Sequence, residues 1–322
     1  MTSKNYFDYS DILIRPSNKT KFNSRKDVSI TNFYRHVPVC AANMHGVGTI
    51  DVGIAMQSYG MLTFVCKDVP LKEWIEKSDL IDFNYMIPTF GITDDDIKMA
   101  SMMYQQFSDD IKFVCIDVAN GHMKLVIEKY KELQSQFPKA KFIVGNISSI
   151  DSLVDYTTAG IWCAKVGTGS GSVCTTRFVT GIGVPQASLI QEMVEHRHKL
   201  NLNIKIMSDG GIRHTGDIVK SLVLGADYVM AGSYFAGHIE GGNVDLRKTK
   251  VSFMGSSYKQ TKGYVASEGM KTEIPYKGKL KSTLKELCGG LRSACSYLGV
   301  DLDNLYTMKS NIIHVNRQKE SL

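Results

Sequence analysis

Short runs of apolar and β-branched residues alternate with amphipathic segments along most of the chain. Eight of these runs have the length and the continuous apolar character of parallel strands buried on both faces. The runs cover residues 37–43, 61–67, 85–91, 112–118, 140–146, 161–167, 203–211 and 226–232. Helix-like segments separate or follow them at 48–59, 71–81, 93–108, 121–136, 149–159, 185–199, 214–224 and 280–298.

This alternation predicts an α/β fold, a (β/α)8 TIM barrel, in a single domain over residues 1–322. A doubly wound open sheet is the alternative, but eight strands at this spacing close more naturally into a barrel. Two segments fall outside the eight units, an N-terminal extension at 1–36 and an excursion at 250–279 rich in Gly, Ser and Lys. A long excursion after the last barrel strand is typical of a functional lid, so we expect an active-site flap there.

Polar residues or glycine stand at or just past the C-terminal ends of six predicted strands. These residues are Asn43, Lys67, Asp117, Asn146, Gly167 and Asp209. In a TIM barrel this end of the strands carries the active site, so their convergence indicates a site rather than turn chemistry alone. Asp117 and Lys67 are predicted at neighbouring strand ends, where they could form either a proton-handling pair or a structural salt bridge.

The loops after the seventh and eighth strands have the composition of a phosphate site. SDGG at 208–211 follows the seventh strand, AGS at 231–233 follows the eighth, and a helical pattern opens at 214. In TIM barrels these two loops and a short helix N-terminus often hold a phosphate. Glycine suits this role because backbone N–H groups must approach the phosphate oxygens closely.

Composition limits the classes of protein to consider. With 43% hydrophobic and 22% charged residues the chain is typical of a soluble globular protein. No run of 18 apolar residues occurs, and the N-terminus lacks an apolar signal core, so we expect no membrane span and a cytoplasmic location. The net charge of +6 suits an anionic small molecule but does not specify nucleic acid, and none is expected.

Cys174 is set apart from the other cysteines by its neighbours. The seven cysteines show no CxxC spacing, so neither a disulfide framework nor a zinc site is expected, and six of them are predicted to be buried small hydrophobes. Cys174 instead lies in GTGSGSVCTTR, 167–177, behind flexible glycines and beside two threonines and an arginine. A thiolate in such a loop is a candidate nucleophile. The histidines show no metal-binding spacing, and no GxGxxG follows the first strand, so a Rossmann cofactor domain is not indicated.

Several of these segments together resemble the IMP dehydrogenase/GMP reductase family over nearly the whole chain. The most specific is GTGSGSVCTTR, followed by FVTGIGVPQASLI; the others are AANM (41–44), DVANGH (117–122), SDGG, GADYVMAGSYFAGH (225–238), ASEG (266–269) and GGLRSACSYLG (289–299). There is no room between the strands for the regulatory insert of the dehydrogenases, and SRKDV (24–28) and the long excursion resemble the reductases. The chain departs from the family at His45 and Val265, where aspartate and arginine are usual, and at TGSG (168–171), where a proline is common.

The resemblance implies an oxidoreductase of purine nucleotide salvage that converts GMP to IMP and ammonia with NADPH. Cys174 would attack carbon 2 of the guanine and form a covalent thioimidate, which a hydride then reduces. An IMP dehydrogenase lacking its regulatory insert is the first alternative. A purine-nucleotide binding protein that has lost catalysis is the second. The family also implies a homotetramer.

The resemblance assigns roles to individual residues. The catalytic residues it implies are Cys174, Thr176, Glu268, Lys67 and Asp117. The substrate-binding residues are Asp209, Gly210, Gly211, Gly232, Ser233, Met254, Gly255, Ser256, Ser267 and Gly269. The NADPH-binding residues are Lys67, Asp117, Val118, Ala119, Thr168 and Gly169, with Ser24 and Arg25 contributed by a neighbouring subunit. A potassium ion is expected at Gly169, Gly171, Cys174 and Arg177, with backbone carbonyls of the first three as ligands.

Overall fold

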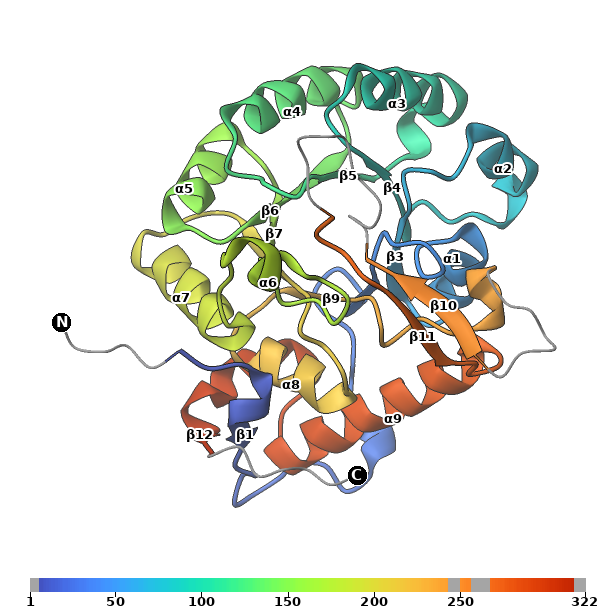
Figure 1. Cartoon of the computed structure of the whole chain (residues 1–322). Coiled ribbons are helices and arrows are strands. Elements are labelled where there is room, and N and C mark those ends of the chain that lie inside the picture. The colour runs from blue at the N-terminus through green and yellow to red at the C-terminus, as the bar shows by residue number, and fades with distance from the viewer. Residues whose placement is uncertain (1–5, 243–249, 256–266, 316–322) are drawn as a thin grey trace.

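The computed structural model describes residues 6–242, 250–255 and 267–315. Eight parallel strands close into a barrel in chain order, so the (β/α)8 fold is confirmed (Figure 1). These strands are β2 (Val37–Ala41), β3 (Met61–Val65), β4 (Met86–Phe90), β5 (Phe113–Asp117), β6 (Lys141–Ile147), β7 (Cys163–Val166), β8 (Lys205–Asp209) and β9 (Tyr228–Ala231). Each lies within one of the eight predicted runs, apart from a single added residue at the end of β6.

Burial on both faces explains why these strands are continuous apolar runs. Every residue of β2, β3 and β4 is buried, as are the first four residues of β5. One face of each strand fills the barrel interior and the other packs against the surrounding helices. The last residue of β5, Asp117, is only half-buried, and it pairs in register with Gly145 of β6. The polar chemistry therefore begins where the apolar runs end.

The helices surround the barrel (Figure 1). Their bounds are α1 (Ile50–Gln57), α2 (Leu71–Glu76), α3 (Asp94–Phe107), α4 (Lys124–Gln136), α5 (Ile150–Ala159), α6 (Thr176–Thr180), α7 (Gln186–Lys199), α8 (Thr215–Val223) and α9 (Leu280–Leu298). Local signals set the ends of several of them. The Thr93 hydroxyl accepts from the backbone N–H of Asp96, whose carboxylate accepts from the N–H of Thr93, which forms a capping box for α3. Gly160, with φ of +85°, ends α5 in a left-handed conformation.

Two small antiparallel sheets lie outside the barrel and were not predicted. β1 (Ile12–Ile14) pairs with β12 (Ile312–His314), and β10 (Lys250–Met254) pairs with β11 (Lys271–Pro275). Sequence periodicity misses them because the strands are short and, in the first sheet, come from the two ends of the chain. The remaining elements are short 3-10 helices: η1 (Tyr9–Asp11), η2 (Arg25–Asp27), η3 (Ser78–Leu80), η4 (Ser108–Asp110), η5 (Ile239–Gly241) and η6 (Leu302–Asn311).

The N-terminal extension is bonded to the barrel wall. The backbone N–H of Phe7 donates to the Ser188 hydroxyl over 2.8 Å, and the Asp8 carboxylate accepts from the backbone N–H of Gln186 over 2.7 Å. The Tyr9 hydroxyl lies 2.8 Å from the Ser208 hydroxyl inside the structure. These contacts fix the extension against α7 and β8. In the described part of the chain, no helix combines the length and the apolar character needed to cross a membrane.

Candidate active site

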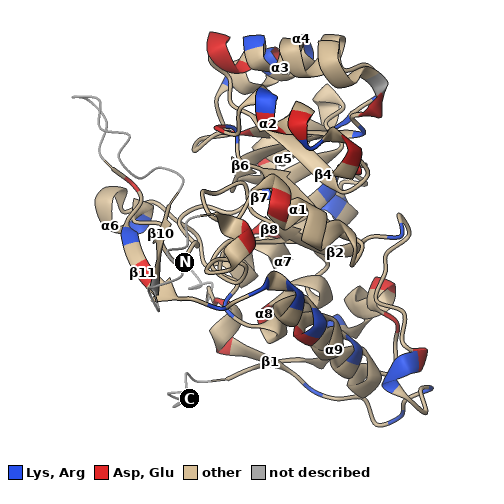
Figure 2. Ribbon diagram, turned by 90° about the vertical axis from the view of Figure 1, so that its right-hand side faces the viewer, with Lys and Arg blue, Asp and Glu red and all other residues tan. Residues whose placement is uncertain are grey.

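The loop that carries Cys174 lies against the segment that carries Glu268. The backbone N–H of Thr175 donates to the Glu268 carbonyl over 2.9 Å, and the N–H of Met270 donates to the Val173 carbonyl over 2.9 Å. Cys174 also forms an isolated antiparallel bridge with Gly269. Figure 2 shows α6 together with β10 and β11 on one side of the barrel, beyond the C-terminal ends of the strands. The described parts of the excursion, 250–255 and 267–279, thus contact the loop after β7.

Three of the predicted catalytic side chains form a continuous line. The Thr176 hydroxyl donates to the Glu268 carboxylate over 2.7 Å, and its oxygen lies 3.2 Å from the Cys174 sulfur. Because the single hydroxyl proton of Thr176 is directed at Glu268, the thiol must be the donor in its contact with Thr176. This arrangement provides a proton path from the thiol to the carboxylate. The other six cysteines are buried, as predicted, and Cys174 is half-buried.

A buried lysine forms a second polar cluster at the strand ends. Lys165, on β7, is only 1% exposed; its ammonium pairs with the Asp117 carboxylate and lies 3.5 Å from the Asp209 carboxylate. Burial alone would lower the pKa of Lys165, but the two carboxylates outweigh it and raise that pKa above its usual value. Burial would likewise raise the pKa of Asp117, but Lys165 outweighs burial and lowers it. Both groups therefore stay charged near neutral pH.

Asn146 and Asn43 complete this cluster. The Asn146 amide donates to the Asp209 carboxylate over 2.8 Å and to the Gly167 carbonyl over 3.0 Å. The Asn43 side-chain oxygen lies 3.5 Å from the Lys165 ammonium. Five of the six residues predicted to converge at the strand ends, all except Lys67, thus lie in this cluster around Lys165. Sequence reasoning assigned Lys165 no role, although a lysine inside an apolar strand was a signal of a buried ion pair.

Lys67 does not pair with Asp117, although its position in the sequence suggested that it could. The salt-bridge partner of Asp117 is Lys165, and the charge of Lys67 only assists in lowering the pKa of Asp117. Lys67 is exposed, just past β3, and in the described part of the chain its ammonium has no ion pair. The sequence left open whether Asp117 and Lys67 form a proton-handling pair or a structural salt bridge. The structure contains a salt bridge of Asp117, but its lysine is Lys165. The ammonium of Lys67 is therefore available to a bound ligand.

Glycines permit close contacts of the loops after β8 and β9 with neighbouring segments. Gly210 has φ of +95°, and a Cβ there would lie 2.4 Å from the Ser170 hydroxyl. Gly211 has φ of +78°, and a Cβ on Gly232 would lie 2.7 Å from the Met44 sulfur. Only glycine fits the crowded, left-handed position 210, which places its peptide beside the Cys174 loop. This geometry fits a cradle for an anionic group next to Ser233.

The N-terminus of α8 is less available to a bound phosphate than the sequence suggested. The backbone N–H groups of Arg213 and His214 both donate to the Asp217 carboxylate, each over 3.0 Å. The helix thus caps itself with its own acidic residue, which occupies amides that a phosphate would need. A phosphate in this region would depend on the glycine loops before and beside α8 rather than on these two amides.

The flap contributes further predicted residues. The backbone N–H of Gly255 donates to the Met270 carbonyl over 3.1 Å, and a Cβ on Gly255 would lie 2.9 Å from the Val173 carbonyl. Met254 ends β10, and the Ser267 hydroxyl donates to the Gly269 carbonyl over 3.1 Å. These contacts place the flap strands against the Cys174 loop. Ser256 and Val265 lie outside the described residues.

The residues expected to bind potassium surround a tight loop. Gly169 has φ of +72°, and a Cβ there would lie 2.7 Å from the Cγ of Arg177. The Gly171 carbonyl accepts from the N–H of Cys174 over 3.1 Å, and the Arg177 guanidinium donates to the Val184 carbonyl over 2.6 Å. A carbonyl has a second lone pair, so the oxygen of Gly171 can still face a cation. Neutral carbonyl oxygens are the ligands that potassium prefers, and the loop fits the ion in donor type.

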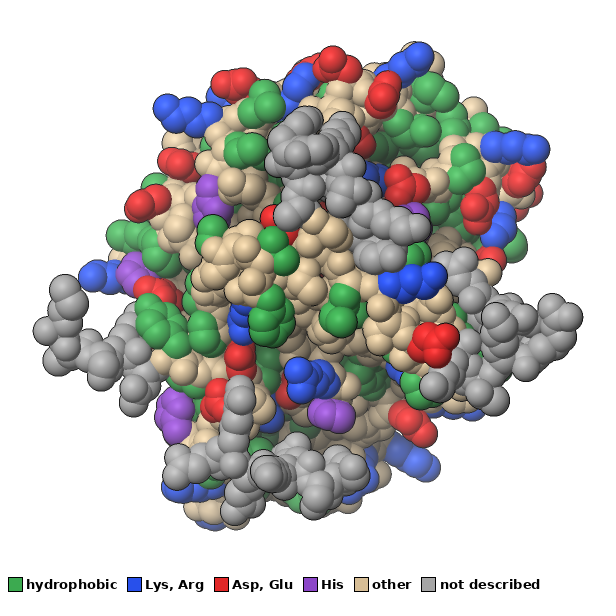
Figure 3. All heavy atoms as spheres, viewed as in Figure 1, with side chains coloured by type: hydrophobic (Ala, Val, Ile, Leu, Met, Phe, Trp, Pro, Cys, Tyr) green, Lys and Arg blue, Asp and Glu red, His purple; other side chains and the backbone are tan. Residues whose placement is uncertain are grey.

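The expected cofactor residues fall into two groups. Val118, Ala119 and Thr168 follow β5 and β7 near Asp117; the backbone of Val118 bonds to Gly145 and Asn146 of β6. Ser24 and Arg25 are exposed on the outer wall, where η2 packs against α9. Their predicted role thus requires a cofactor held by a neighbouring subunit. Figure 3 shows the face with the strand ends, where acidic and basic side chains surround hydrophobic ones near its centre.

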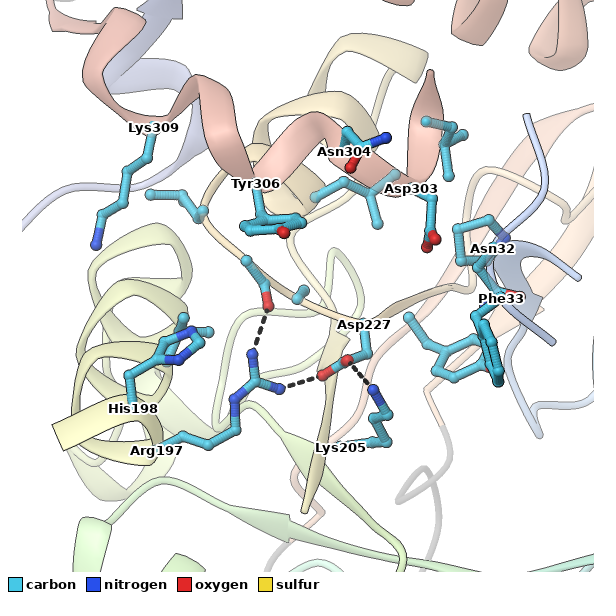
Figure 4. A pocket seen from close by; sticks show the side chains of 18 of the residues that line it. Asn32, Phe33, Arg197, His198, Lys205, Asp227, Asp303, Asn304, Tyr306 and Lys309 are labelled. Carbon is cyan, nitrogen blue, oxygen red and sulfur yellow. Dashed lines mark hydrogen bonds and ion pairs between the residues drawn. The ribbon is translucent and has the colours of Figure 1, made fainter. Parts of the chain in front are cut away.

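A separate cavity of about 460 Å³ lies at the opposite end of the barrel, where the strands begin. Asp227 pairs there with both Arg197 and Lys205, as Figure 4 shows. The single carboxylate is shared by the two cations and balances one of their two charges, and Tyr306 lies across the cavity from them. Because none of the cysteines lines this cavity, it lacks the nucleophile on which the candidate site depends.

Comparisons with known proteins identify the family of the chain. The family described as "IMP dehydrogenase / GMP reductase domain" matches residues 6–321. A GMP reductase of Vibrio vulnificus is 32% identical over an alignment of 337 positions that covers 98% of this chain and 96% of the relative. GMP reductase 2 of Bos taurus is 32% identical over 97% of this chain and 94% of its own length, and the GMP reductase of Caenorhabditis elegans is 33% identical over 98% and 93%. The chain is therefore an oxidoreductase that belongs to the IMP dehydrogenase/GMP reductase family.

Proposed function

We propose that this protein is a GMP reductase, which converts GMP to IMP and ammonia at the expense of NADPH. The observation that carries the proposal is the line formed by the Cys174 thiol, the Thr176 hydroxyl and the Glu268 carboxylate. Relatives named GMP reductase support it because they match nearly the full chain.

The hydrogen-bonded line of Cys174, Thr176 and Glu268 is suited to the first half of the reaction, in which the thiol attacks the purine and ammonia leaves. Cys174 gives up its proton through Thr176 to Glu268, and its sulfur attacks carbon 2 of the guanine ring. The amino group at carbon 2 leaves with that same proton as ammonia, and a thioimidate links sulfur and purine. Glu268 and Thr176 are suited to the proton transfer because they remain hydrogen-bonded to each other beside the sulfur.

The second half needs a hydride, which bound NADPH supplies to carbon 2. The bond between carbon and sulfur then breaks, Cys174 leaves as a thiolate, and IMP departs. The exposed ammonium of Lys67 is available to a polar group of the cofactor, and the carboxylate of Asp117 is held in place by Lys165. Asp209 and the glycine loops at 210–211 and 232–233 would hold the ribose and phosphate and so position the ring.

Two further features belong to the proposal. A potassium ion would brace the loop through the carbonyls of Gly169, Gly171 and Cys174. A homotetramer would bring Ser24 and Arg25 of one subunit to the cofactor of another. Its support is that both residues are exposed on the outer wall, beside α9.

The test follows NADPH absorbance after GMP is added to the wild-type chain and to Cys174→Ala. We expect the wild type to consume NADPH and release equal amounts of ammonia and IMP, and the variant to be inactive. If the wild type instead reduces NAD in the presence of IMP and ignores GMP, the chain is a dehydrogenase. Binding of GMP without either reaction would identify a nucleotide-binding protein.

A further inference from the structure

Three potential metal ligands meet at the rim of the barrel, outside the catalytic line. His45 follows β2, whereas Cys66 and Asp68 follow β3 on either side of Lys67. Their nitrogen, sulfur and oxygen atoms all lie within 4.8 Å of one another. The His45 Nε2 is 3.0 Å from the Asp68 carboxylate, and the Cys66 sulfur is 3.8 Å from the same oxygen.

The backbone holds the two loops together independently of these side chains. The N–H of Cys66 donates to the Gly48 carbonyl over 2.7 Å, which joins the loop after β3 to the loop after β2. The N–H of Val69 donates to the Cys66 carbonyl over 3.1 Å and closes a turn around Lys67. Gly48 permits this approach, because a Cβ there would lie 2.3 Å from the Phe64 carbonyl. The ligand atoms are therefore brought together by the fold before any ion binds.

The spacing matches that of ligands on one tetrahedral ion. Zinc binds sulfur at about 2.3 Å and nitrogen or oxygen at about 2.0–2.2 Å, so neighbouring ligands lie roughly 3.3–3.7 Å apart. The distances from the Asp68 carboxylate to His45 and to Cys66, 3.0 and 3.8 Å, lie on either side of this range. Small side-chain movements would bring all three atoms onto one ion.

The charges also match a divalent ion. A thiolate from Cys66 and a carboxylate from Asp68 together neutralise two positive charges, and His45 adds a neutral nitrogen. Binding would release the thiol proton to solvent. The side chains of His45 and Asp68 are 49% and 58% exposed, so an ion has an entry path and a fourth position open to water.

We propose that His45, Cys66 and Asp68 form a binding site for a divalent transition metal ion of the zinc type. The sequence did not predict a zinc site, because one ligand comes from a different loop and the spacing of the other two matches no zinc motif. The site is distinct from the Cys174 loop and from the Lys165 cluster. It does not depend on the proposed reductase activity.

The test uses the full chain, stripped of metal, in the Cys174→Ser background so that the half-buried thiol of Cys174 cannot supply the sulfur. Cobalt(II) is the probe, because a thiolate ligand gives an intense charge-transfer band and tetrahedral coordination gives visible bands. We expect one cobalt per chain with both signals, and displacement by zinc. A cobalt titration without a thiolate band would overturn the proposal.

Ligand variants locate the site. Cys66→Ser should abolish the thiolate band, whereas Cys288→Ser, which removes a buried cysteine of α9, should leave it unchanged. His45→Ala and Asp68→Ala alter exposed side chains and so should fold; each should weaken cobalt binding more than about tenfold, since even outer-shell changes cost 10–100-fold. A band that survives Cys66→Ser, or an affinity unchanged by His45→Ala and Asp68→Ala, would place the metal elsewhere.

Discussion

Thr176 donates its hydroxyl proton to Glu268 over 2.7 Å, although one residue begins a helix after β7 and the other lies in the flap after β9. The same hydroxyl oxygen lies 3.2 Å from the sulfur of Cys174. A single side chain thus links the candidate nucleophile to the candidate acid. The link exists only because the flap and the loop pair along their backbones.

Replacing Thr176 with valine tests this link. Thr176→Val keeps the shape of the side chain but removes the hydroxyl, so we expect reductase turnover to fall about 100-fold or more, the range for loss of a positioned acid–base group. Steady-state rates with GMP and NADPH measure the effect. Thr175→Val is the matched control, because it changes the neighbouring hydroxyl and leaves the link intact. Equal losses in both variants would show that the link does not carry the proton.

Replacing Lys165 with methionine tests the buried ion pair. The change leaves Asp117 and Asp209 without their cation in a site where Lys165 is 1% exposed. Breaking a buried pair from one side costs about 3–5 kcal/mol, so we expect a loss of that order in the free energy of unfolding. Urea unfolding followed by circular dichroism measures it. Adding Asp117→Asn should recover part of the loss, and a single variant as stable as the wild type would contradict the prediction.

The loss of stability at acid pH tests the contribution of the Asp117 carboxylate to the fold. Its pKa is lowered in the folded protein, chiefly by Lys165, so the carboxylate stabilises the fold above its unfolded pKa of about 3.9. That contribution is lost as pH falls below about 4 toward the lower folded value. We expect Asp117→Asn to lose less stability than the wild type between neutral pH and pH 3 or so. The measurement is the free energy of unfolding of both proteins as a function of pH across this range. Parallel curves for the wild type and the variant would contradict the prediction.

Asp227 provides a stability test far from the catalytic line. Its carboxylate pairs with Arg197 and Lys205 and accepts from the backbone N–H of Ile206 over 2.9 Å. We expect Asp227→Asn to destabilise the fold by about 1–3 kcal/mol, because two partly buried cations lose their counter-ion. Turnover at 25 °C should be unchanged, since the cavity lies at the opposite end of the barrel. Asp303→Asn, an exposed change at the same cavity, should leave the melting temperature unchanged.

Much of the fold could be predicted because the signals are local. A strand buried on both faces is largely an apolar run, and the barrel strands follow this rule apart from a few polar positions such as Lys165 in β7. The two small sheets were not predicted from the sequence. Pairing between Ile12–Ile14 and Ile312–His314, for example, depends on where the ends of the chain meet. The capping of α8 by its own Asp217 was also not predicted, because the same residue pattern would suit a helix N-terminus that is free to bind a phosphate.

Within the site, the sequence by itself determined which chemistry is present. The glycine-rich run before Cys174, the threonine at 176 and the polar strand ends are all visible as local patterns. Only the tertiary structure decided which of these groups meet. It paired Asp117 with Lys165 rather than with Lys67, because the register of β5, β6 and β7 sets which side chains face the same point. It also joined His45 to Cys66 and Asp68, because β2 and β3 pair side by side and so bring the loops that follow them together.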